Sequence, residues 1–194
     1  MTQEQTRRDE ADLIPAGCSW IRAAAASFEP EANQVTTTGG DTISYDALVV
    51  ATGLQLRWER IKGLEEALGR QGVTSNYSRE HLPYTWETIR HFPGGTAIFT
   101  FPDTPIKCAG APQKIMYLAD DIFKATSGVG VNTKVVFATA GPGIFGVPVY
   151  ARVLKKVVEQ RGIQVLLRHN LREIRAEEQV AVFEVSDAEG KTSS

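Results

Sequence analysis

The loop sequence FPDTPIKCAGAP, from Phe101 to Pro112, contains the most reactive type of side chain in the protein, the thiol of Cys108. A helix is predicted to begin at Pro112, because proline suits the first turn of a helix, so the cysteine precedes a helix N-terminus. The partial positive charge of that terminus, together with Lys107 and Lys114, favours the thiolate form. A thiolate attacks sulfur or a flavin carbon, which indicates a redox or nucleophilic cysteine. The competing interpretation is a buried cysteine that packs as a small apolar residue.

A second candidate site is the sequence YDALVVATG, which ends in Ala51, Thr52 and Gly53. The apolar run from Ala47 to Ala51 is typical of a strand that is buried on both faces in a parallel sheet. Small residues after such a strand let a ligand approach the backbone, and nucleotides bind at the carboxyl ends of parallel strands. The same pattern also fits a buried strand that ends in a glycine turn without any ligand.

A nicotinamide-binding domain needs glycines after its first strand, so that the pyrophosphate can lie on a helix N-terminus. In their place, the strand predicted at 96–101 is followed by two prolines and the pair Lys107–Cys108. The later sequence Gly141–Pro142–Gly143 lacks the third glycine of GxGxxG. The domain is therefore expected to have a nucleotide-binding shape without the means to hold NAD(P)H.

The elements that must position these residues divide the chain into four segments. Residues 1–13 are predicted to be a flexible polar arm, and 14–63 to contain a β-hairpin formed by 34–37 and 42–45. Within that segment, residues 19–28 are ambiguous, because the alanine run 23–26 favours helix. Residues 64–95 are interpreted as a linker with one helix, and 96–194 alternate strand and helix. The fold class is therefore α/β, with a Rossmann-like parallel sheet, flanking helices and a separate β-hairpin.

Composition excludes several classes of function. The net charge of the 194 residues is −2 and basic residues are dispersed, so no nucleic-acid partner is expected. Cys18 and Cys108 are the two cysteines and neither lies in a CxxC pair, so no metal site is predicted. The sequence contains no signal peptide and no apolar run long enough to cross a bilayer. The predicted location is a reducing compartment such as the cytoplasm.

The stretch AIFTFPDTPIKCAGAPQKIMYLADDIF strongly resembles sulfide:quinone oxidoreductases, in particular the branch that includes the mitochondrial enzymes. The resemblance runs from about Ile14 to Val185 and includes ATGLQLRWERIKGL, SNYS, GIFGVPVYA and AVFE. It implies FAD as cofactor, sulfide and quinone as substrates, and a pair of cysteines beside the flavin. Cys108 matches one family cysteine. By the same resemblance Ala51, Thr52 and Gly53 would contact FAD, and Pro105 and Lys107 would line the region beside the flavin ring.

The sequence also departs from the family pattern. It lacks the GxGxxG unit that cradles the FAD pyrophosphate and the segment with the second cysteine and the membrane-docking elements. Residues 14–63 are therefore interpreted as a partial FAD-binding domain, and the chain as an internal fragment, inactive in isolation, with weak or absent FAD binding. An uncovered apolar sheet edge predicts self-association. The alternatives are an NAD(P)H-dependent flavoprotein oxidoreductase and a non-catalytic Rossmann-like interaction module.

Overall fold

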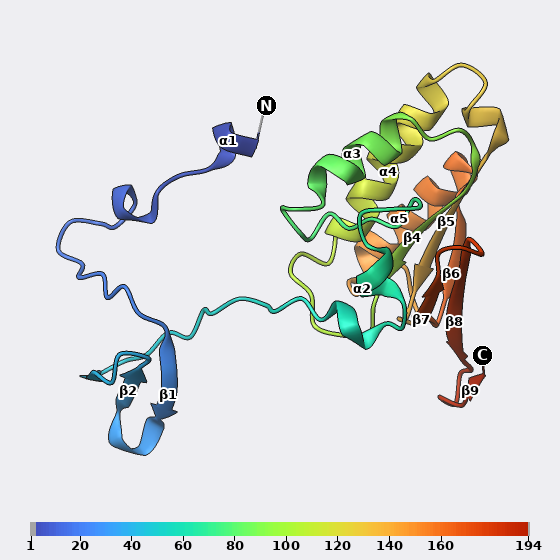
Figure 1. The fold of residues 1–194 in the computed structure, drawn as a ribbon. Coiled ribbons are helices and arrows are strands. Elements are labelled where there is room, and N and C mark those ends of the chain that lie inside the picture. The colour runs from blue at the N-terminus through green and yellow to red at the C-terminus, as the bar shows by residue number, and fades with distance from the viewer. Residues whose placement is uncertain (1–2, 194) are drawn as a thin grey trace. The chain divides into compact units, whose positions relative to one another are not determined.

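The computed structural model describes residues 3–193, which belong to two compact units, Met1–Gly53 and Leu54–Ser194 (Figure 1). The first unit ends at Gly53, the last residue of the YDALVVATG stretch, and the second begins at Leu54. The segment 64–95 lies in the second unit, where Leu64, Ala67 and Ile89 are buried. Each unit has its own sheet structure and is described separately below.

The first unit is built around a three-stranded antiparallel sheet of order β1-β2-β3. Its elements are α1 (Gln3–Thr6), η1 (Glu10–Asp12), β1 (Ala25–Glu29), η2 (Pro30–Ala32), β2 (Gln34–Thr37) and β3 (Thr42–Ser44). The predicted hairpin is confirmed, since β2 pairs with β3 around a turn in which Gly40 has a φ of +90°. In the ambiguous stretch 19–28, the structure has a strand from Ala25 and no helix. Pairing of Phe28 with Val35 makes this region a strand, because tertiary contacts override alanine's helix propensity.

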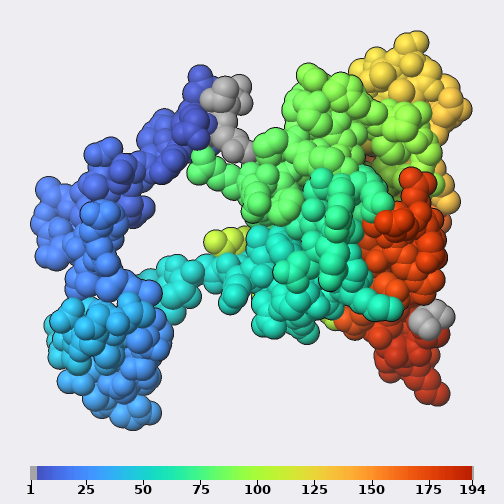
Figure 2. All heavy atoms as spheres, in the orientation of Figure 1, coloured from blue at the N-terminus to red at the C-terminus, as the bar shows by residue number. Residues whose placement is uncertain are grey.

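The apolar run from Ala47 to Ala51 is not the buried strand that its composition predicts. It has no strand partner within residues 3–193, and Val49 and Val50 are 88% and 59% exposed. Figure 2 shows this light-blue to cyan stretch as a single thickness of chain. A strand needs neighbours to pair its N–H and C=O groups, so hydrophobic composition alone cannot form one. Ala51, Thr52 and Gly53 are consequently exposed in extended chain.

The second unit confirms the predicted α/β fold. Its parallel sheet has the order β4-β5-β6, formed by Gly95–Phe101, Thr133–Thr139 and Gln164–Leu167. The helices and 3-10 turns of this unit are η3 (Trp58–Arg60), α2 (Leu64–Ala67), α3 (Leu82–Arg90), α4 (Ala111–Ala125), η4 (Gly130–Asn132) and α5 (Pro148–Arg161). Helices α4 and α5 are the two crossovers between successive parallel strands, as the alternating sequence pattern predicts.

One face of the parallel sheet packs against these helices (Figure 1). Met116 and Phe123 of α4 are buried with Phe137 of β5 and Val158 of α5 in one hydrophobic core. The rings of Phe92 and Phe123 lie 4.6 Å apart between centroids, which joins the end of α3 to the same core. Burial of side chains of this size stabilises the unit by about 1.5–3 kcal/mol each.

The opposite face is covered by the antiparallel sheet β7-β8-β9, formed by His169–Arg175, Val180–Ser186 and Thr192–Ser193. Because side chains alternate along a strand, Val136 and Ala138 of β5 point away from the helices, and both are buried. A β-bridge between Lys62 and Glu173 attaches the preceding segment to the edge of β7. Strand β4 contacts both β5 and β7, and the cysteine loop begins where β4 ends.

Candidate functional site

Cys108 lies in the loop between β4 and α4, close to the start of the helix. Its carbonyl oxygen accepts a hydrogen bond of 2.9 Å from the N–H of Ala111, the first residue of α4, and Gly110 is the N-cap. The side chain is exposed, so the apolar packing expected of a structural cysteine is absent at this position. Cys108 therefore precedes a helix N-terminus, as the sequence predicts.

Tyr77 contacts the cysteine loop from a segment that precedes α3. Its hydroxyl donates a hydrogen bond of 2.8 Å to the carbonyl oxygen of Lys107. Burial, and secondarily the negative charge of a neighbouring Cys108 thiolate, raises the pKa of Tyr77. The phenol therefore keeps its proton, which it needs in order to donate. Sequence reasoning noted Tyr77 only within the SNYS stretch and gave it no role.

The backbone around Tyr77 is tied to α3. The hydroxyl of Thr85, which is buried on that helix, donates to the Ser75 carbonyl at 3.2 Å, and the N–H of Tyr77 donates to the Ser75 hydroxyl at 3.2 Å. His81 and Ser78 form a side-chain hydrogen bond of 2.9 Å in the same turn. Tyr77 is thus held independently of the loop that its hydroxyl contacts.

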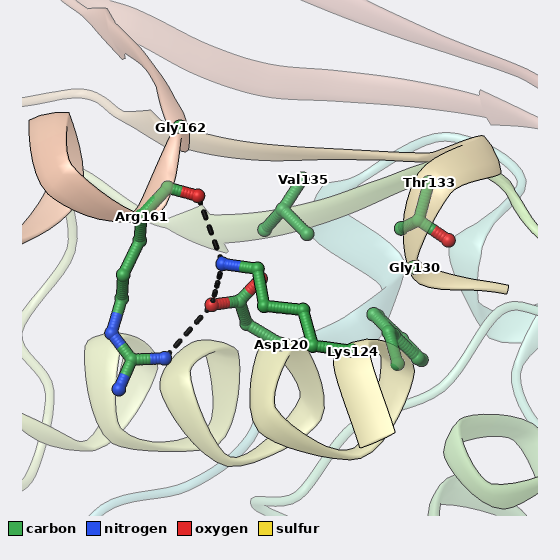
Figure 3. Close-up of a pocket in the computed structure, with 8 residues that line it drawn as sticks. Asp120, Lys124, Gly130, Thr133, Val135, Arg161 and Gly162 are labelled. Atoms are coloured by element: carbon green, nitrogen blue, oxygen red, sulfur yellow. Dashed lines mark hydrogen bonds and ion pairs between the residues drawn. The ribbon is translucent and has the colours of Figure 1, made fainter. Parts of the chain in front are cut away.

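A separate polar cluster of the unit joins α4 to α5 around a cavity of about 120 Å³ (Figure 3). The lining residues are Asp120, Phe123, Lys124, Gly130, Thr133, Val135, Arg161 and Gly162. The Asp120 carboxylate already accepts from Lys124 and Arg161, each at 2.8 Å. Because one oxygen of the Asp120 carboxylate is bound by two cations of the chain itself, this cluster holds the two helices together.

The sequence-predicted residues fall into two groups. Pro105 and Lys107 are exposed in the loop that carries Cys108. Ala51, Thr52 and Gly53 lie at the end of the first unit, on exposed chain. Their side chains are short, and Gly53 has a φ of +83°, a conformation that favours glycine.

No helix within residues 3–193 has both the length and the apolar character needed to cross a membrane. Among the same residues, no three or more His, Cys, Asp or Glu side chains are arranged to hold a metal ion.

The second unit is thus an α/β unit whose first parallel strand leads into a cysteine-bearing loop. No protein-family model matches the chain. Over 94% of its length it is 45% identical to the mitochondrial sulfide:quinone oxidoreductase of Dictyostelium discoideum, and over 95% it is 43% identical to that of Mus musculus. The chain is a sequence relative of the sulfide:quinone oxidoreductases, as its motifs predict.

The match covers only part of these relatives, because the chain spans about 40% of their length. A solved structure gives the same result. The sulfide:quinone oxidoreductase from the hyperthermophilic bacterium Aquifex aeolicus superposes with a TM-score of 0.64 and 25% identity, covering 89% of this chain and 39% of that one. The likeness confirms the α/β fold class.

Proposed function

We propose that this chain forms the cysteine-bearing part of a flavin-dependent oxidoreductase that oxidises sulfide and passes the electrons through FAD to quinone. The observation that carries the proposal is the exposed Cys108 at the start of α4, within a chain that is 45% identical to a sulfide:quinone oxidoreductase. Because the chain spans about 40% of that relative, the activity is proposed for a protein of the relative's full length.

Cys108 is assigned the role of nucleophile and persulfide carrier. In the net step, its thiolate sulfur becomes bonded to the sulfur of hydrosulfide, one proton is released, and two electrons leave the sulfur pair. The product is a persulfide on Cys108, whose outer sulfur can then be passed to a thiol or similar acceptor. FAD, when bound, supplies the acceptor for the electron pair. A second cysteine beside the flavin, which the family resemblance implies, is expected to share the sulfur with Cys108.

The remaining proposed roles follow from residue type and exposure. Ala51, Thr52 and Gly53 offer an unobstructed backbone to FAD, while Pro105 stiffens the loop beside the flavin ring. The ammonium of Lys107 adds positive charge next to Cys108, which favours approach of the hydrosulfide anion. We therefore assign to the loop between β4 and α4 the role of holding sulfide near the thiolate.

The chain by itself is proposed to bind FAD weakly or not at all and to lack turnover. The run from Ala47 to Ala51 has no strand partner in the described residues, so the turn at Thr52 and Gly53 is not preorganised. The exposed apolar side chains of Val49 and Val50 support the further proposal that the chain associates with itself. We also propose that the longer protein attaches peripherally to a membrane, where quinone is found.

Sequence identity to sulfide:quinone oxidoreductases favours this function over an NAD(P)H-dependent flavoprotein. The loop after β4 adds a local argument, because prolines and exposed Lys107 stand where a pyrophosphate would need a glycine cradle. No observation of the described residues favours the non-catalytic interaction module.

The experiment is a full-length chimera in which this chain replaces the matched segment of the Dictyostelium enzyme. Sulfide-dependent quinone reduction and the flavin absorption spectrum are measured with Cys108, with Cys108→Ala and with Cys18→Ala. We expect Cys108→Ala to abolish quinone reduction while the flavin spectrum is retained, and Cys18→Ala to leave both unchanged. Quinone reduction that persists in Cys108→Ala would refute the assigned role.

A further inference from the structure

Cys108 has an unusual backbone conformation, with a φ of +56°. Residues other than glycine seldom adopt this left-handed region, because the Cβ atom then approaches the following carbonyl oxygen. A cysteine keeps such a conformation only where neighbouring contacts determine it. The contacts that hold Cys108 therefore also decide the direction of its Cα–Cβ bond.

Both peptide groups that flank the Cα atom of Cys108 are held by hydrogen bonds. The carbonyl of Lys107, in the peptide before Cys108, accepts from the Tyr77 hydroxyl at 2.8 Å. The carbonyl of Cys108, in the peptide after it, accepts from the N–H of Ala111 at 2.9 Å. Since peptide groups are planar, the rotation between these two planes is set by φ and ψ of Cys108 alone. The two hydrogen bonds together thus fix the direction of the Cα–Cβ bond of Cys108.

We propose that Tyr77 is the positioning residue for Cys108, because its hydroxyl holds the Lys107 carbonyl and thereby keeps the cysteine left-handed, which sets the direction in which its side chain leaves the backbone. The inference rests on the proposed function, to which it adds a residue that orients the reactive thiol without contacting substrate. The hydrogen bond joins residues 30 positions apart in the chain, so no local sequence pattern contains it.

Two properties suit Tyr77 to this role. Its backbone is attached to α3 through Ser75 and the buried Thr85, so the hydroxyl has a support that does not depend on the cysteine loop. Its phenol remains protonated, since burial and the charge of Cys108 both raise its pKa. Phenylalanine at this position would keep the ring and lose only the donor.

The test compares Tyr77→Phe with the matched control Tyr84→Phe in the 194-residue chain. The Tyr84 hydroxyl accepts the N–H of Gly72 at 2.9 Å, so the control also removes one hydroxyl–backbone hydrogen bond from the same region. The ¹³Cα and ¹³Cβ chemical shifts of selectively labelled cysteine report the backbone conformation of Cys108, and Cys18 in the first unit is the internal reference.

We expect the Cys108 shifts to move away from left-handed values in Tyr77→Phe, with the ratio of left-handed to other backbone conformers falling by about fivefold, the effect of one lost hydrogen bond. The Cys18 shifts, and all cysteine shifts in Tyr84→Phe, should remain as in the wild type. Unchanged Cys108 shifts in Tyr77→Phe, or an equal movement in both variants, would overturn the inference.

A second measurement applies if Tyr77→Phe does not fold. Cys108→Ala removes the negative charge beside Tyr77, so the phenol should ionise at lower pH, as followed by ultraviolet absorbance with Tyr77 assigned by NMR. An unchanged ionisation of Tyr77 would show that the two side chains are not neighbours in solution. Neither measurement uses sulfide, FAD or quinone. A failure of the chimera assay would therefore refute the proposed function alone, and unchanged NMR shifts would refute the positioning role alone.

Discussion

The guanidinium of Arg161 on α5 lies 2.8 Å from the carboxylate of Asp120 on α4, and the Asp120 side chain is only 3% exposed. Arg161 also bonds Asp121 at 2.7 Å, and these two carboxylates raise its pKa. Lys124 provides a second cation to Asp120 at 2.8 Å and donates to the Arg161 carbonyl at 2.9 Å (Figure 3). The pair ties together the helices that follow β4 and β5, and so stabilises the helix whose N-terminus follows Cys108.

Replacement of that arginine should destabilise the second unit. In Arg161→Leu, the buried Asp120 loses one of its two cations, and we expect the free energy of unfolding in urea to fall by about 1–3 kcal/mol. Arg152→Leu is the control, because Arg152 is an exposed residue of the same helix, and its effect should stay within about 0.5 kcal/mol. Equal urea midpoints for the two variants would contradict a stabilising role for the pair.

Gly63 should tolerate no side chain. A Cβ atom at this position would lie 2.2 Å from the carbonyl oxygen of Ile174, at the point where Lys62 and β7 exchange backbone hydrogen bonds. We expect Gly63→Ala to lower the free energy of unfolding by more than about 2 kcal/mol. Gly72→Ala separates the steric clash from the cost of a side chain at positive φ. Gly72 has a similar φ of +79° with nothing within 4 Å of its Cβ position. Its cost should be only about 1 kcal/mol.

Stability should decline in alkali because of two tyrosines. Burial is the main cause that raises the pKa of both Tyr77 and Tyr117 above 10.0, and a nearby Arg161 opposes it at Tyr117. A group with a raised folded pKa contributes its full stability below the unfolded pKa and loses it as pH rises through the folded value. Urea midpoints should therefore be steady around neutral pH and fall above about pH 10. In the double variant Tyr77→Phe/Tyr117→Phe, the urea midpoint should decrease less steeply with pH. An equally steep decrease in the variant and the wild type would show that these tyrosines are not the cause.

Self-association should depend on the exposed run that precedes Gly53. Val49 is 88% exposed beside unpaired backbone, which provides an apolar edge for a second copy. Light scattering after size exclusion should show a mass that increases with protein concentration, and Val49→Asp should remain monomeric. Val131→Asp is the control, because Val131 is 89% exposed on a turn of the second unit, and it should associate like the wild type. A wild-type chain that is monomeric at every concentration would refute the proposal.

Local patterns predicted the elements whose stability is local. The helix that begins near Pro112, the helix that ends at Gly162, and the strands on either side of them were identified from periodicity and from proline and glycine positions. The hairpin of β2 and β3 was predicted for the same reason, since its turn sequence favours a single geometry. The family resemblance, which the comparisons confirm, came from the loop that contains Cys108.

The sequence by itself determined the α/β alternation, the cysteine at a helix N-terminus and the kinship with sulfide:quinone oxidoreductases, because these depend on residues that are close together in the chain. Only the tertiary structure decided that Ala47 to Ala51 is exposed chain, since a strand exists only when partners satisfy its backbone. It alone placed the Tyr77 hydroxyl on the Lys107 carbonyl, because a hydrogen bond between distant segments depends on how helices and sheets pack.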